Sequence, residues 1–259
     1  LPVVTMIVTD SVICDGESVT LTAASDIAGS SFIWSNGAAT PQIIVTPNLT
    51  NTYYLTVTSP EGCVSTANTT ITVNPNPIAS IVPSSGAICL GSTATLTANT
   101  NIAVSNYLWN TAETNPTINV TPATTSIYNV TVTTAEGCSG TADISILVNP
   151  LPGISVTAPT AAICLGSSVD LTANSNHPST TYLWNTGQTT TTINVAPAAT
   201  STYSVTGTDI NGCTGTTEFL VTVNPLPEID IVAPQNQICQ GMSVQLTASS
   251  NIPNTNYEW

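Results

Sequence analysis

The sequence contains no lysine and no arginine among its 259 residues. Its 14 aspartate and glutamate residues give a formal net charge of -14 at pH 7. Charged residues make up only 5% of the chain, against about a quarter in ordinary soluble proteins. Proteins bind a nucleic-acid backbone with cationic side chains that displace its counterions, and this chain has none. We therefore expect no nucleic-acid partner.

Long apolar runs are also missing. A helix that crosses a bilayer needs roughly 20 consecutive apolar residues, and basic clusters hold proteins on anionic membrane surfaces. The sequence has neither, so we expect no membrane insertion. It also begins at Leu1 without a basic segment or an apolar signal region, which leads us to expect a piece cut from a longer chain.

Histidine is almost absent, since His177 is the only one. One histidine cannot supply a His-rich zinc site, and no acidic stretch matches a calcium-binding loop. We expect no catalytic residue, no cofactor and no metal, and hence no enzyme. Glu228 and Asp230 could meet a divalent ion near a repeat junction, but solvated surface acids are the favoured interpretation.

What the sequence does contain is a strict repeat of 75 residues, without insertions or deletions. The following residues keep that interval: Cys14, Cys89, Cys164 and Cys239; Trp34, Trp109, Trp184 and Trp259; Cys63, Cys138 and Cys213; Tyr53, Tyr128 and Tyr203. Asn-Pro pairs close each unit. The predicted repeats are residues 1–75, 76–150 and 151–225, followed by 226–259 as the N-terminal part of a fourth. Proline fixes φ at the junctions, so we expect short, rigid linkers.

Within each repeat, apolar residues alternate with polar ones. In "GESVTLTAA" the side chains of Val19, Leu21 and Ala23 share one face, which predicts a half-buried strand. "TYYLTVTSPEGC" alternates likewise and ends in a turn. About seven such strands in 75 residues predict an all-β fold of tandem immunoglobulin-like sandwiches in an elongated, end-to-end array. We expect the four tryptophans and three tyrosines of the period to form the cores.

The seven cysteines favour an oxidising, extracellular setting over the cytosol. In such a sandwich the turns at Cys14 and Cys63 lie at opposite ends, about 23 Å apart for a seven-residue strand. Disulfide-linked Cα atoms lie only 4.4–6.8 Å apart. If repeats stack end to end, the favoured bonds are Cys14 with Cys138 and Cys89 with Cys213. The within-repeat set stays open as the alternative: Cys14 with Cys63, Cys89 with Cys138 and Cys164 with Cys213. Cys239 then needs a partner beyond Trp259.

The blocks "ICLGSSVDLTA", "YLWNTGQ" and "NGCTGT" resemble the PKD-like and immunoglobulin-like repeats of very large secreted surface proteins of the Bacteroidota. The nearest resemblance is to gliding-motility adhesins of the SprB type. It implies a cell-surface filament that is exported by type IX secretion, is moved by the gliding machinery and attaches the cell to a surface. Two alternatives remain open, a carbohydrate-binding repeat array that contacts surface glycans and the accessory region of a secreted enzyme.

Overall fold

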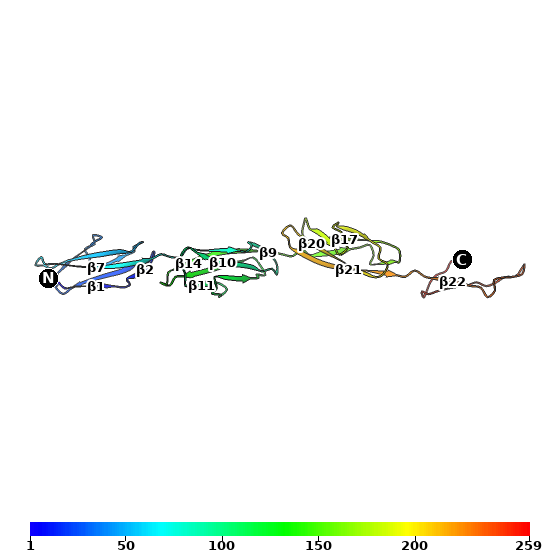
Figure 1. Ribbon diagram of the computed structural model, residues 1–259, viewed down its shortest axis with the longest axis horizontal. Helices are drawn as coiled ribbons and strands as arrows, with labels where there is room; N and C mark the ends of the chain where they lie inside the picture. Colours follow the sequence, from blue (N-terminus) through cyan, green and yellow to red (C-terminus); the bar gives the residue numbers. More distant parts are fainter. The chain divides into compact units, whose positions relative to one another are not determined.

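The computed structural model describes residues 1–259 and contains β-strands as its only regular elements (Figure 1). The chain forms two compact units, Leu1–Val148 and Asn149–Trp259. The first unit holds two β-sandwiches, and the second holds one sandwich and a two-stranded sheet. No helix is present that could cross a membrane.

The first sandwich consists of two sheets built from seven strands. One sheet has the order β1-β3-β5, from β1 (Val4–Val8), β3 (Val19–Ser25) and β5 (Gln42–Val45). The other has the order β2-β7-β6-β4, from β2 (Val12–Cys14), β7 (Val64–Asn74), β6 (Asn51–Thr58) and β4 (Ser31–Trp34). All neighbours are antiparallel except β2 and β7, which are parallel. The first strand of the repeat is thus split between the two sheets.

The second and third sandwiches repeat this topology. The strands of the second are β8 (Ala79–Pro83), β9 (Ala87–Cys89), β10 (Ala94–Thr100), β11 (Asn106–Trp109), β12 (Thr117–Val120), β13 (Ser126–Thr133) and β14 (Ser139–Asn149). Those of the third are β15 (Ile154–Thr157), β16 (Ala162–Cys164), β17 (Val169–Ser175), β18 (Thr181–Trp184), β19 (Thr192–Val195), β20 (Ser201–Thr208) and β21 (Thr214–Asn224). β22 (Ile229–Val232) and β23 (Thr247–Ser250) pair alone. The predicted tandem immunoglobulin-like sandwiches are confirmed.

A tryptophan lies at the centre of each sandwich core. Trp34, Trp109 and Trp184 are almost completely buried. Each indole Nε1–H donates to a backbone carbonyl six residues ahead, at 2.8–2.9 Å, so burial leaves no polar atom unpaired. Ala23 and Leu55 pack into the first core at the positions where an antibody domain carries cysteines. Apolar packing therefore stands in place of that cross-sheet disulfide.

Trp259 is 76% exposed, and its assignment to a core stays a prediction. A sandwich core needs two facing sheets, whereas residues 226–259 form only the β22-β23 sheet, and Ile229 and Ile231 are exposed on it as well. Tyr53 and Tyr128 are buried as expected, and Tyr203 is partly buried against the third core.

Candidate functional site

The parallel pairing of β2 with β7 fixes where Cys14 lies. Cys14 is in register with Asn74, the last residue of β7, and the next N–H, from Asp15, donates to the Asn74 carbonyl at 2.9 Å. From Asn74 the chain continues directly into the linker Pro75-Asn76-Pro77. Because parallel strands end at the same edge of a sheet, Cys14 sits where the chain leaves the first sandwich.

Cys138 lies on the tight turn between β13 and β14 in the second sandwich. Thr134 closes this turn twice, since its N–H donates to the Cys138 carbonyl at 2.8 Å and its Oγ1 accepts from the Cys138 N–H at 3.2 Å. Gly137 takes φ +91° in the turn, a conformation that glycine adopts without strain. Both Thr134 and Cys138 are buried, so the cysteine is held in a fixed position.

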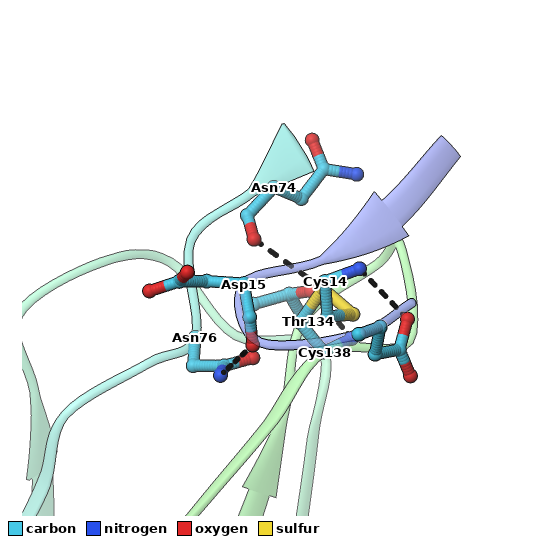
Figure 2. The surroundings of a disulfide bond; sticks show 7 residues. Cys14, Asp15, Asn74, Asn76, Thr134 and Cys138 are labelled. Carbon is cyan, nitrogen blue, oxygen red and sulfur yellow. Dashed lines mark hydrogen bonds between the residues drawn. A yellow bond between two sulfur atoms is a disulfide. The ribbon is translucent and has the colours of Figure 1, made fainter. Parts of the chain in front are cut away.

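A disulfide joins Cys14 to Cys138 across the junction of the first two repeats (Figure 2). Their Cα atoms lie 5.5 Å apart and their sequence separation is 124. Polar contacts surround the bond. Asn76 Nδ2 donates to the Asp15 carbonyl at 2.9 Å, and the Cys138 Sγ lies 3.9 Å from the Asn74 carbonyl oxygen. The turn after β2, the end of β7, the linker and the β13–β14 turn therefore meet at one place.

The other cysteines fall into two groups. Cys63, Cys164 and Cys239 are free and exposed. Cys89 and Cys213 are disulfide-bonded, and their pairing with each other stays a prediction. The within-repeat set is wrong, because Cys14 bonds Cys138 while Cys63 and Cys164 bond nothing. Its physical fault is the one anticipated from topology, since the β6–β7 turn and the end of β2 lie at opposite ends of β7.

A close backbone approach fixes the linker against the second sandwich. A Cβ atom on Gly140 would lie 1.9 Å from the Pro77 carbonyl oxygen, so only glycine fits there. Asn101 Oδ1 accepts from the Ile78 N–H at 2.7 Å, and the Asn101 N–H donates back to the Ile78 carbonyl at 3.3 Å. No motif singled out Gly140 or Asn101 in the sequence, although a glycine inside a strand pattern is a signal of close backbone approach.

The third sandwich has the same contacts in its own linker. A Cβ on Gly215 would lie 2.0 Å from the Pro152 carbonyl oxygen, and Asn176 Oδ1 accepts from the Gly153 N–H at 2.7 Å. In the first repeat Ser65 stands where Gly140 and Gly215 stand in the others. The first repeat keeps the side-chain contact, since the Val3 N–H donates to Asp26 Oδ1 at 2.7 Å.

His177 lies in a polar pair that the sequence did not indicate. Its Nδ1 donates to Oδ2 of Asp209 at 3.0 Å, while Asp209 Oδ1 accepts from the Asn211 and Cys213 N–H groups, each at 2.9 Å. Burial alone raises the pKa of the Asp209 carboxyl, but the hydrogen bonds from Cys213, His177 and Asn211 outweigh burial and hold that pKa below its usual value. Asp209 occupies the place of Ser59 and Thr134, which cap the equivalent turns.

No three histidine, cysteine, aspartate or glutamate residues lie together in an arrangement that could hold a metal ion, and this includes Glu228 and Asp230. The Asp209 carboxylate of the histidine–aspartate pair accepts from the Cys213 N–H and so caps the turn that carries Cys213. The candidate functional site of this chain is the disulfide-bonded junction at Cys14 and Cys138.

The chain matches no protein-family model, and no curated protein matches it. Solved structures with low similarity include the eight N-terminal immunoglobulin domains of the Down syndrome cell adhesion molecule, at 14% identity and TM-score 0.43, over 97% of this chain and 40% of that chain. A three-domain segment of titin is 11% identical with TM-score 0.44, and the match covers 87% of this chain and 98% of the titin segment. A solved chain of a 1.5-MDa bacterial ice-binding adhesin is 18% identical with TM-score 0.34, and the match covers 87% of this chain and 99% of that solved chain.

Proposed function

We propose that this chain is a structural stalk segment of a very large secreted cell-surface adhesin, used for surface attachment and gliding motility. Its units are the three repeats 1–75, 76–150 and 151–225 and the N-terminal part of a fourth, 226–259. The observation that carries the proposal is the disulfide between Cys14 and Cys138, which joins one repeat to the next instead of closing a single domain. A covalent bond between neighbouring repeats strengthens the connection between them, which is what a stalk requires.

The presence of disulfide bonds supports an extracellular location. Disulfides persist in oxidising compartments and are rare in the cytosol. Four cysteines of the chain are disulfide-bonded. The sequence resemblance to PKD-like adhesin repeats points to the same location and to export by type IX secretion. Partners of this segment are then neighbouring repeats and, through the parent chain, the secretion and gliding machinery.

The alternatives find less support among the residues. A carbohydrate-binding array would present aromatic platforms to solvent, but Trp34, Trp109 and Trp184 are buried with their indole N–H groups satisfied by the backbone. The repeated sandwiches, with charged residues at only 5% of the chain, suit a passive spacer better than a recognition surface.

The proposal is tested in cells of the source organism. An antibody raised against the chain should label intact, unpermeabilised cells, and deletion of residues 1–259 from the parent protein should shorten the labelled filaments and reduce attachment to glass under flow. A matched deletion of a different segment of equal length controls for changes in expression. Label found only after permeabilisation would refute a surface stalk.

A further inference from the structure

The disulfide between Cys14 and Cys138 changes the shortest covalent route through the first two repeats. Without it, a force applied at Leu1 and at the end of β14 runs through every residue between them. With it, the route runs from Leu1 along β1 and β2 to Cys14, across the sulfur atoms to Cys138, and out along β14. Residues 15–137 form a closed loop whose ends are held 5.5 Å apart at the cysteine Cα atoms.

The closed loop contains almost all of the packed core. Both core tryptophans of this unit, Trp34 and Trp109, lie inside it, as do all buried residues of the first core except Ile13 and of the second except Ile146. The linker Pro75-Asn76-Pro77 also lies inside it. Tension that enters the first repeat therefore reaches the second through the Cys14–Cys138 disulfide and bypasses the peptide linker.

The strands on the direct route are already close to their full length. β1, β2 and β14 are extended, and an extended strand rises about 3.3 Å per residue, near the limit of the chain. Force along this route consequently gains little length. Elsewhere in the unit, hydrogen bonds and apolar packing would have to resist the force, and these give way far more readily than covalent bonds.

We propose that the Cys14–Cys138 disulfide carries tension across the first junction and shields residues 15–137 from that tension. This inference deepens the proposed stalk function, on which its biological relevance rests. The stalk keeps its length under load while the disulfide is intact and becomes extensible when the disulfide is reduced. From the sequence separation of 124 and about 3.5 Å per extended residue, breaking the bond exposes about 430 Å of additional contour length.

The test is single-molecule force spectroscopy on the full 259-residue chain. The absence of lysine makes the amino group of Leu1 the only primary amine, so one handle attaches there specifically. The second handle attaches to an azide-bearing aromatic residue introduced at Leu151, which is 43% exposed and follows β14. Neither attachment uses thiol chemistry, so the cysteines keep their native state.

The oxidised chain should extend between these handles without long unfolding steps. The Cys14→Ser variant should show unfolding steps that together add about 430 Å, the length expected for the separation of 124 residues. Wild-type chain reduced with a phosphine during pulling should gain the same length, which provides the comparison even if the variant folds poorly. The matched control is Cys63→Ser, which removes a free, exposed thiol and should behave as the oxidised wild type.

A gain of about 430 Å in oxidised wild type whose Cys14–Cys138 bond is verified by mass spectrometry would overturn the inference. An unchanged length in Cys14→Ser would overturn it equally. These outcomes concern the isolated chain and are independent of its location in the cell. Failure of surface labelling would instead refute the stalk and leave the load path intact.

Discussion

Replacing Cys14 with serine should destabilise the first two sandwiches by several kcal/mol. In the chain-entropy model a disulfide restricts the unfolded chain according to the length of the loop that it closes. If both sandwiches unfold, that loop corresponds to the separation of 124 residues and the effect is about 5 kcal/mol. If only the first unfolds, the flexible loop shortens to roughly 60 residues and the effect is about 4 kcal/mol.

Native-state hydrogen exchange measures this change strand by strand. Amide groups of β3 and β10 lie in the middle of their sheets and exchange only when their sandwich unfolds. Since about 1.4 kcal/mol corresponds to a factor of ten, a loss of 4 kcal/mol should speed their exchange about a thousandfold. β17 occupies the same place in the third sandwich and serves as the internal standard.

A control variant and the exchange of β17 test whether the loss of the disulfide causes the effect. Cys63→Ser should leave exchange in β3 unchanged, because that thiol is free and exposed. Unaltered exchange of β3 and β10 in Cys14→Ser would refute the loop-closure argument. Equal acceleration in β17 would also refute it, since the effect would then not be specific to the bonded repeats.

Three other predictions concern the linker, the turn cap and the remaining cysteines. Gly140→Ala should cost about 1–3 kcal/mol through its clash with the linker carbonyl, whereas Gly86→Ala, which meets no atom within 4 Å, should be nearly neutral in urea denaturation. Folding lowers the pKa of the Asp209 carboxyl, so the ionised carboxylate stabilises the folded state. This contribution is complete above the usual pKa of about 3.9 and is lost as the pH falls through the lowered pKa. In Asp209→Thr the melting temperature should therefore fall less steeply as the pH is lowered below about 4. The same fall in wild type and variant would contradict this. Peptide mapping without reduction should find Cys89 bonded to Cys213, and a protease that cuts at acidic or aromatic residues is required because trypsin has no site.

Much of the fold could be predicted because its signals are local and repeated. Alternation in "GESVTLTAA" correctly placed Val19, Leu21 and Ala23 in the core, since side chains of a strand point to opposite faces in turn. The 75-residue spacing likewise identified the equivalent tryptophans, three of which are buried. Burial of the fourth, Trp259, stays a prediction, because residues 226–259 form only one of the two sheets that a core needs.

The candidate site depended on contacts between residues far apart in the sequence. The sequence left two disulfide sets open because no local pattern specifies that Val12–Cys14 pairs in parallel with the end of β7, and that pairing is what brings Cys14 to the junction. His177 and Asp209 are 32 residues apart and match no motif, so only the folded loops bring them within 3.0 Å. The sequence by itself determined the repeat, its strands and its apolar cores, since periodicity is written in neighbouring residues. The tertiary structure decided between the two sets by joining Cys14 to Cys138, because a disulfide forms only between Cα atoms that the completed sheets hold a few ångströms apart.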